Sequence, residues 1–284
     1  AEKIDRLRRG ELPFREPGLP ELLREQLAAR RIVFTNDAKE AVTGGEILML
    51  AVGTPSASDG SADLRYVEAA VDTIARHIDG PKIVVTKSTV PIGTNRWIRR
   101  RLQGLVDGAR TPVEVVSNPE FLREGSALMD SLHPSRTVIG GDNREAMEKV
   151  LGLYAGLDAP HLMCGFETAE LIKYASNGFL AAKISYMNEI ARLAEAVGAD
   201  VDTVAQGMGM DPRIAPKHLK AGIGYGGSCF PKDVDELLAL ARRRHIRLRL
   251  LAETKRVNDT QIDWFIGKIN AVQPIAGSRA LVLG

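Results

Sequence analysis

A cysteine set among glycines and charged residues is the feature of this chain that most suggests chemistry. Residues 226–233 read GGSCFPKD, so Cys229 follows two glycines and precedes Lys232 and Asp233. Glycines let a backbone approach a ligand closely, a nearby cation favours the reactive thiolate form of a cysteine, and a carboxylate can orient or activate water. The segment predicts Cys229 as a covalent nucleophile. The alternative is a buried structural cysteine at the start of a helix.

Two further segments place polar side chains after apolar strands. Residues 87–94 (KSTVPIGT) offer hydroxyls and backbone N–H groups suited to a phosphate, a ribose or a bound water, with helix capping by Ser or Thr as the alternative. In residues 118–125 (NPEFLREG), Glu120 and Glu124 are four apart, so a helical turn would set both carboxylates on one side. One of them could act as a general base, unless both only stabilise a helix N-terminus.

Lys173 and Asn177 are also four residues apart, within a helical pattern. An ammonium and an amide on one helix face could stabilise an oxyanion, and a solvated helix face is the alternative. Arg213 could bind a phosphate or a carboxylate, although an ordinary surface arginine is the simpler interpretation. We expect Cys164 to be a core residue.

The composition excludes several classes of protein. Apolar residues make up 44% and charged residues 26% of the 284 positions, as in a globular protein of about two domains. A net charge of +2 gives no reason to expect a nucleic acid or a membrane as partner, and no run of about 18 apolar residues is present. The five histidines show no metal-ligand spacing. Two cysteines far apart favour a reducing cytoplasm over a disulfide framework.

Strand and helix patterns alternate through the first half. Runs of β-branched residues between helices are typical of a parallel sheet covered on both faces. Ligand sites in such sheets lie at the carboxyl ends of strands, here in the loops 53–61, 87–93 and 117–125. The pattern predicts strands at 32–35, 46–52, 83–86, 113–116 and 137–139, and helices at 19–31, 64–78 (with Asp63 as N-cap), 94–106 and 144–154.

The second half reads as helical. Helices are predicted at 168–197, 200–207, 233–245 and 253–272. A helix about thirty residues long often crosses a subunit interface, so we expect a homodimer through it. Both ends look interrupted, because the chain opens on a polar helix and loop and residues 279–283 read as a strand without a partner. We expect the middle part of a longer protein.

Taken together, these residues resemble the UDP-glucose dehydrogenase family of nucleotide-sugar dehydrogenases, over nearly the whole chain. The matching segments, in family order, are EPGL at 16–19, VGTP at 52–55, KSTVP at 87–91, SNPEFL at 117–122, the helix with Lys173 and Asn177, and GGSCFPKD at 226–233. The resemblance implies an α/β protein. A Rossmann-like NAD-binding domain (1–165) is incomplete at its N-terminus, a helical dimerisation and catalytic domain follows (166–272), and 273–284 begin a UDP-binding domain.

The resemblance implies a four-electron oxidation of UDP-glucose to UDP-glucuronate with two NAD. The primary alcohol of the sugar becomes an aldehyde, Cys229 adds to it as a thiohemiacetal, a second oxidation gives a thioester, and water releases the acid. A covalent route keeps the reactive aldehyde from escaping. The match assigns Glu120 as general base, Thr89 and Asp233 as residues that position the water, and Lys173 and Asn177 as the oxyanion pair.

The same match implies two sets of binding residues. His218 stands two positions before Lys220, where the family commonly has an aromatic residue, so the sugar pocket is expected to differ there. The cofactor contacts are Val52, Thr54, Pro55, Thr89, Glu124 and Lys232. The substrate contacts are Glu120, Phe121, Leu122, Glu124, Lys173, Asn177, Lys220, Tyr225, Gly226 and, acting in the neighbouring subunit, Arg213.

The chain differs from the family pattern in one segment that binds the cofactor. The family begins with a strand and a Gly-x-Gly-x-x-Gly turn that holds the NAD pyrophosphate, and no such turn precedes the matched segments. We expect the 284-residue chain alone to bind NAD and substrate weakly and to be inactive. A GDP-mannose dehydrogenase stays open, although Phe230 and TKSTVP at 86–91 favour UDP-glucose. A 3-hydroxyacid dehydrogenase would not need Cys229, and a non-catalytic dimerisation module would not need the intact catalytic set.

Overall fold

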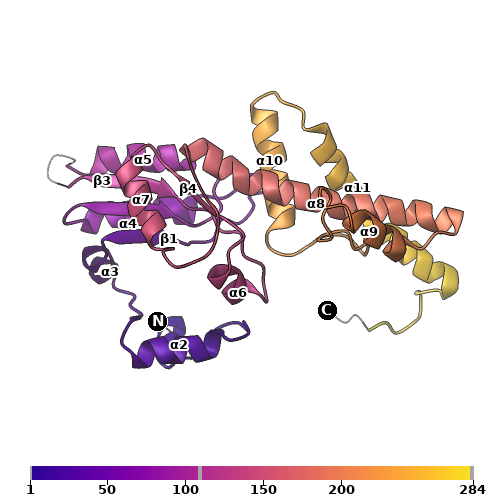
Figure 1. Cartoon of the computed structure of the whole chain (residues 1–284), viewed down its shortest axis with the longest axis horizontal. Helices are drawn as coiled ribbons and strands as arrows, with labels where there is room; N and C mark the ends of the chain where they lie inside the picture. The colour runs from indigo at the N-terminus through magenta and orange to yellow at the C-terminus, as the bar shows by residue number, and fades with distance from the viewer. Residues whose placement is uncertain (1, 108–110, 282–284) are drawn as a thin grey trace. The chain divides into compact units, whose positions relative to one another are not determined.

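The structure is a computed structural model that describes residues 2–107 and 111–281 (Figure 1). It divides into two compact units. Unit 1 comprises Ala1–Pro55 and Ala62–Lys173, and unit 2 comprises Ser56–Ser61 and Tyr174–Gly284. The three-part domain division expected from the sequence stays a prediction.

Unit 1 is built on a five-stranded sheet in the order β1-β2-β3-β4-β5. The first three strands are parallel, with Leu50 opposite Thr86 and Thr86 opposite Ser117. Their carboxyl ends are therefore level at one edge, as the alternating pattern predicted. The strands are β1 (Ile47–Leu50), β2 (Lys82–Thr86), β3 (Val113–Ser117), β4 (Thr137–Gly140) and β5 (His161–Cys164).

The prediction of a parallel sheet was wrong at one junction. β4 meets β3 antiparallel through the pair Ser117 and Gly140, while β4 and β5 are parallel to each other. Parallel neighbours need a crossover, usually a helix, that returns the chain to the start of the sheet. The link between β3 and β4 holds only the six-residue helix α6 (Ala127–Leu132).

Helices cover both faces of this sheet, which gives three layers (Figure 1). Alternate residues of a strand point to opposite faces, so Val84 packs with α4 (Arg65–His77) and α5 (Thr94–Leu105), whereas Val85 packs with α7 (Arg144–Gly152). The shorter helices of unit 1 are α1 (Glu2–Arg8), α2 (Leu19–Ala28) and α3 (Ala38–Gly44).

Three local predictions in unit 1 need correction. Residues 31–37 form no strand and Val33 is 76% exposed, because β-branched residues make a strand only where a neighbour completes the ladder. The N-cap of α4 is Leu64, and Asp63 instead binds the backbone N–H and guanidinium of Arg65. β5 was not predicted, since its sequence HLMC contains no β-branched residue.

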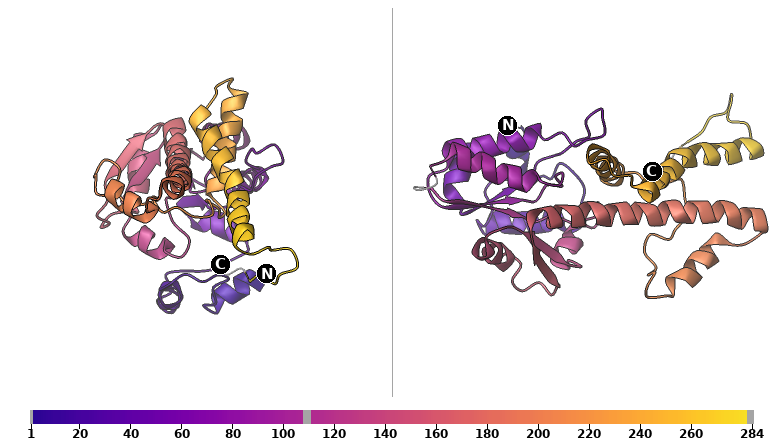
Figure 2. Two further views of the ribbon diagram at one scale, coloured as in Figure 1. Left: turned by 90° about the vertical axis from the view of Figure 1, so that its right-hand side faces the viewer. Right: turned by 90° about the horizontal axis from the view of Figure 1, so that it is seen from above.

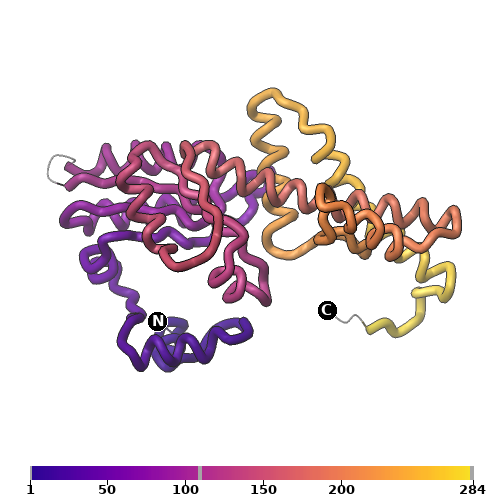
Figure 3. The backbone as a smooth tube through the Cα atoms, in the orientation of Figure 1, coloured from indigo at the N-terminus to yellow at the C-terminus, as the bar shows by residue number. Residues whose placement is uncertain are grey.

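Unit 2 is helical, and its longest helix, α8 (Phe166–Val197), begins in unit 1 and runs unbroken for 32 residues (Figure 2, right). The others are α9 (Val201–Gly209), α10 (Phe230–Arg243) and α11 (Arg249–Val272). Residues 210–229, between α9 and α10, contain only turns and bends (Figure 3).

Two sequence predictions concern the C-terminal end and the membrane. Residues 279–281 of the expected strand at 279–283 are not in a strand, and 282–283 lie outside the described residues. Within the ranges that the structure describes, every helix is too short or too polar to span a bilayer.

Candidate functional site

The loops that follow β1 and β2 are hydrogen-bonded to each other at the carboxyl edge of the sheet. The Ser88 hydroxyl donates to the backbone oxygen of Val52 at 2.7 Å. The Thr54 hydroxyl donates to the backbone oxygen of Thr89 at 2.8 Å. The structure thus brings together three of the predicted cofactor contacts, Val52, Thr54 and Thr89. Pro55 follows them on the surface.

The N-terminus of α5 is capped by a buried carboxylate from α8. Glu170 is 3% exposed and accepts from Gly93 N at 2.6 Å, from Asn95 N at 2.8 Å and from Asn95 Nδ2 at 2.8 Å. Burial raises the pKa of Glu170, although these hydrogen bonds act to lower it. The backbone groups of Gly93 and Asn95 are therefore already paired rather than open to a phosphate. The alternative of helix capping by Ser or Thr was wrong, since the N-cap, Gly93, has no side chain.

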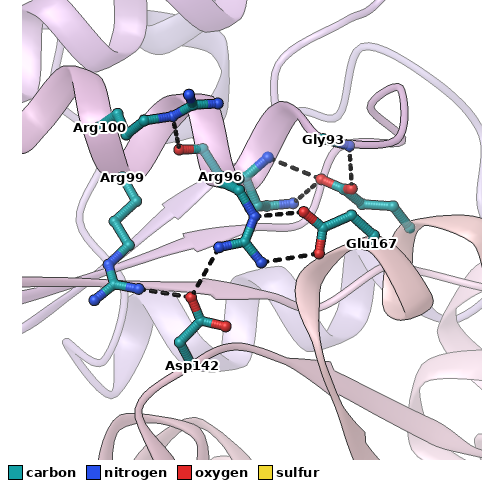
Figure 4. A network of polar contacts seen from close by, with 8 residues as sticks. Gly93, Arg96, Arg99, Arg100, Asp142 and Glu167 are labelled. Atoms are coloured by element: carbon teal, nitrogen blue, oxygen red, sulfur yellow. Dashed lines mark hydrogen bonds and ion pairs between the residues drawn. The ribbon is translucent and has the colours of Figure 1, made fainter.

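An ion-pair network beside this cap joins α5 to the first turn of α8 (Figure 4). The Arg96 guanidinium donates to the two Glu167 carboxylate oxygens at 2.5 and 3.0 Å, and this interaction lowers the pKa of Glu167. Asp142 accepts from Arg96 at 3.3 Å and from Arg99 at 2.6 Å. The network and the Glu170 cap together hold the start of α8 against α5, and so fix where Lys173 lies in unit 1.

Glu120 and Lys173 form an ion pair in unit 1. Lys173 Nζ donates to Glu120 Oε1 at 2.9 Å, with side-chain exposures of 4% for Lys173 and 23% for Glu120. The other carboxylate oxygen accepts the Leu122 N–H at 2.5 Å. Two cations lie near the Phe121 ring, with Lys173 Nζ 5.4 Å and the Arg136 guanidinium carbon 3.8 Å from its centroid. The alternative of a solvated face at Lys173 is excluded.

The segment that carries Glu120 is held from several sides. Residues 118–123 form no helix, so the expectation that Glu120 and Glu124 share a helical face was wrong. Asn118 is 1% exposed, and its amide donates to the Val138 oxygen at 2.9 Å and accepts from Lys87 Nζ at 3.1 Å. These bonds join Asn118 to residues that are distant in sequence, and so fix the start of the segment that carries Glu120.

The end of this segment is held by Glu16, a residue to which the sequence pattern assigned no structural role. Glu16, only 5% exposed, accepts the N–H groups of Gly125 at 3.1 Å and Leu128 at 3.2 Å. A buried carboxylate more than a hundred residues away in sequence thus caps α6. Glu124 and Leu122, predicted as contacts of cofactor and substrate, lie on the surface.

In unit 2, Cys229 is exposed at the N-cap of α10. The structure places it at the start of a helix, as the alternative interpretation had it, but it is not buried there. Its sulfur lies 3.6 Å from Ser228 Oγ. One turn on, the Asp233 backbone N–H donates to the Cys229 carbonyl at 2.9 Å. Partial positive charge at a helix N-terminus stabilises negative charge, so this position suits a nucleophilic sulfur.

The Asp233 carboxylate is 1% exposed and joins two predicted site residues. It accepts from Asn177 Nδ2 at 2.6 Å and from Lys232 Nζ at 2.5 Å. Asn177 is itself 7% exposed and lies one turn beyond Lys173 on α8. The structure therefore brings Asn177, Lys232 and Asp233 into one cluster beside the first turn of α10.

The remaining predicted contacts lie in the segment 210–229. Tyr225 is buried, which raises the pKa of its phenol to about 12. The Tyr225 ring and the His218 ring each lie edge-on to the Phe230 ring, with ring centroids 6.2 Å apart in both pairs. Gly226 and Lys220 are exposed. Arg213 is also exposed, and its guanidinium is paired with the Asp211 carboxylate at 2.6 Å.

Two remaining expectations concern metal and the second thiol. In the described parts of the chain, no three His, Cys, Asp or Glu residues are placed to bind a metal ion. Cys164 is half-buried at the end of β5 rather than fully in the core, and burial raises the pKa of its thiol.

Comparison with known proteins extends this picture. Residues 1–158 match the model described as "UDP-glucose/GDP-mannose dehydrogenase family, NAD binding domain", and residues 167–260 match the central domain of the same family. The chain is 44% identical over 283 residues to UDP-glucose 6-dehydrogenase TuaD of Bacillus subtilis, covering 99% of this chain and 61% of that protein. It is 46% identical over 290 residues to UDP-glucose 6-dehydrogenase of Rhizobium meliloti, and the match covers 99% of this chain and 66% of that protein.

The fold is similar to that of a solved UDP-glucose dehydrogenase from the archaeon Pyrobaculum islandicum. The TM-score is 0.92 at 41% identity, over 95% of this chain and 63% of that one. The chain thus spans about two thirds of the length of the relatives it matches.

Proposed function

Because this chain belongs to the UDP-glucose/GDP-mannose dehydrogenase family, we propose that it carries out the NAD-dependent oxidation of UDP-glucose to UDP-glucuronate through a covalent intermediate on Cys229. The observation that carries the proposal is the exposed Cys229 at the N-terminus of α10, one turn before the buried carboxylate of Asp233. The relatives named UDP-glucose 6-dehydrogenase support the choice of sugar nucleotide.

The carboxyl edge of the sheet fits part of an NAD site. Parallel strands bind dinucleotides at this edge, and the hydroxyls of Ser88 and Thr54 already tie its loops together. The Thr86 hydroxyl, at the end of β2, is buried and has no hydrogen-bond partner among the described residues. We propose that Val52, Thr54, Pro55, Thr89 and Glu124 would hold NAD, and that Lys232 is a further cofactor contact. Bound there, NAD would serve as the hydride acceptor for both oxidations.

Glu120 and Lys173 are proposed to handle protons and developing charge. An ammonium has three donors, and one of those of Lys173 is used by Glu120. The other donors would bind the sugar oxygen as it becomes an alkoxide or oxyanion. The Glu120 side chain lies next to this ammonium and would serve as the base.

Cys229 is proposed to trap the aldehyde. Its sulfur forms a bond to the carbonyl carbon, and the carbonyl oxygen gains the negative charge that Lys173 and Asn177 would stabilise. Loss of a hydride from this carbon leaves a thioester. Water, positioned by Asp233 and Thr89, then breaks the carbon–sulfur bond, which releases the carboxylate and restores the thiol. The mechanism requires Lys173 and Asn177 to donate to the same sugar oxygen.

Two further features of the whole protein are proposed. A homodimer through α8 is supported by large apolar side chains on its surface, with Phe179 68%, Leu193 58% and Val197 68% exposed. A cytoplasmic location is supported by two free thiols, Cys164 and Cys229. Light scattering of the purified protein would test the dimer, and a monomer at micromolar concentration would contradict it.

A substrate panel tests the function. The natural protein that contains this chain would be incubated with NAD and, separately, UDP-glucose, GDP-mannose and a UDP-N-acetylhexosamine. We expect UDP-glucose to give a kcat/KM at least about tenfold above the others, since a single well-placed polar contact provides that discrimination. Absence of turnover with UDP-glucose would refute the proposal. The chain spans 61–66% of its relatives, so the 284 residues alone are expected to be inactive.

A further inference from the structure

The segment that leads to Cys229 is held by side-chain amides. Residues 210–229 have no helix or strand (Figure 3), so their backbone groups cannot be satisfied by a ladder. Tyr225 in this segment is buried, and buried backbone N–H and C=O groups require partners. The glycines at 222, 224, 226 and 227 leave this backbone especially free in conformation. Something other than the local sequence must therefore fix its course.

Both polar backbone groups of Gly222 are bound by buried amides. Gly222 N donates to Asn188 Oδ1 at 2.8 Å, and Gln261 Nε2 donates to the Gly222 carbonyl at 2.7 Å. Asn188 lies on α8 and is 0% exposed, and Gln261 lies on α11 and is 1% exposed. Helix α8 thus binds the backbone N–H of Gly222, and helix α11 binds its C=O.

Tyr225 is bound in the same way by a single amide. Tyr225 N donates to Asn258 Oδ1 at 2.7 Å, and Asn258 Nδ2 donates to the Tyr225 carbonyl at 3.1 Å. Between the two held residues, Gly224 has φ +109°, and a Cβ there would lie 2.7 Å from Asn258 Oδ1. The close approach of the amide therefore requires glycine at this position.

A neighbouring cation fixes the orientation of one of these amides. Gln261 Oε1 accepts from Arg192 Nη2 at 2.6 Å, so its Nε2 must be the atom that faces the Gly222 carbonyl. Asn258 and Gln261 are three residues apart on α11, on one side of the helix. Of the three amides, that of Asn188 comes from α8 and those of Asn258 and Gln261 come from α11, and all three residues belong to unit 2.

We propose that Asn188, Asn258 and Gln261 are positioning residues that set the course of residues 222–229. Their amides bind backbone N–H and C=O groups that would be paired with a neighbouring strand in a sheet. By fixing this backbone, they set the positions of the buried Tyr225, a proposed substrate contact, and of the exposed Cys229, the proposed nucleophile. This inference rests on the proposed function for its catalytic consequence. A misplacement of about 1 Å at a reacting group can cost about a hundredfold in rate.

Amide hydrogen exchange tests the contacts themselves, without any substrate. In Asn258→Leu, the Tyr225 N–H loses its acceptor, and its exchange is expected to become at least about tenfold faster than in wild type. The matched control is Asn270→Leu, an exposed asparagine of α11 whose Oδ1 accepts from Ile275 N. Unchanged exchange at Tyr225 in Asn258→Leu would overturn the inference.

Gln261→Glu separates positioning from folding. The carboxylate keeps an acceptor for Arg192 and adds a charge pair, but it can no longer donate to the Gly222 carbonyl. In the natural protein we expect kcat to fall about tenfold to a hundredfold with little change in melting temperature. NADH formed per UDP-glucose is expected to drop below two as aldehyde escapes. An unchanged kcat and an unchanged ratio would overturn the inference.

The two proposals fail in different ways. If wild type produces no NADH from UDP-glucose, the proposed function is wrong, and the exchange experiment still decides whether the amides hold the segment. If wild type produces two NADH and both amide variants behave like Asn270→Leu, the function stands and the positioning role is wrong.

Discussion

Replacing Glu170 with alanine is expected to destabilise unit 1 by about 2–4 kcal/mol. The carboxylate is the acceptor for three N–H groups, two of them on Asn95, which is 0% exposed. A buried donor left without an acceptor costs about 1–3 kcal/mol. Water can reach the half-buried Gly93, and relief of the buried charge offsets part of the loss. For a unit of this size the melting temperature should fall by roughly 4–16 °C.

Glu167→Ala is the matched control for this change. Glu167 is one turn earlier on α8 and is also bound to α5, but its side chain is 43% exposed. Exposed ion pairs contribute about 0–1 kcal/mol, so its loss should be small. Both variants would be compared by calorimetry. The reasoning is refuted if Glu170→Ala is no less stable than Glu167→Ala.

The pH dependence gives a second test with a definite sign. Burial raises the pKa of Glu170 above its ordinary value of 4.5, so the folded state binds a proton that the unfolded state has already lost. The stability contributed by this proton is fully present below pH 4.5 and is lost as pH rises through the raised pKa of the folded state. The stability of wild type relative to Glu170→Gln should therefore fall with rising pH. A relative stability of wild type that instead increased as pH rose above 4.5 would contradict this expectation.

The other predictions concern the catalytic groups and the segment before Cys229. Lys173→Met removes the ammonium from its partly buried ion pair with Glu120. It should lower kcat, measured by steady-state kinetics, by about 10²–10³, as for loss of an oxyanion donor; a change in KM alone would contradict this. Asp233→Asn should slow hydrolysis by about a hundredfold and let a covalent sugar adduct accumulate, visible by intact-mass spectrometry. Gly224→Ala should cost about 1–3 kcal/mol from its positive φ and close contact. Gly226→Ala, with nothing within 4 Å of the added Cβ, should be nearly neutral in stability.

The sequence was sufficient where structure follows from local pattern. Periodicity located α5 and α8 to within a few residues, and the loops after β1, β2 and β3 lie at the edge where parallel strands place their ligands. The chemical groups could be named because their types and order matched a family. Their local partners were partly predictable, since Lys232 and Asp233 are adjacent in the chain.

The sequence was insufficient where a contact joins distant residues. Glu170 caps a helix that begins 76 residues earlier, and Glu16 caps one that begins 111 residues later. In the sequence, Glu170 cannot be told apart from an exposed glutamate of a helix, nor Glu16 from an exposed glutamate of a loop. The expected helix at Glu120 failed for a different, local reason, because its own carboxylate accepts the Leu122 N–H, and such a bond competes with a helical turn.

One missed group did leave a signal. Thr254, Val257 and Gln261 are the buried residues of α11, so Gln261 occupies an apolar position of an amphipathic helix. A polar residue at such a position must find a buried partner. Which backbone group it binds could be learned only from the fold.

The most direct test of the account is the number of NADH formed per UDP-glucose by wild type, Cys229→Ser and the control Cys164→Ser, all in the natural protein. Cys164 is a half-buried free thiol on the sheet of unit 1. We predict two NADH per sugar for wild type and Cys164→Ser, and turnover that is lost or stalls at a covalent ester in Cys229→Ser. One NADH per sugar, unaffected by Cys229→Ser, would contradict the thioester mechanism and leave Cys229 as a structural residue at the start of α10.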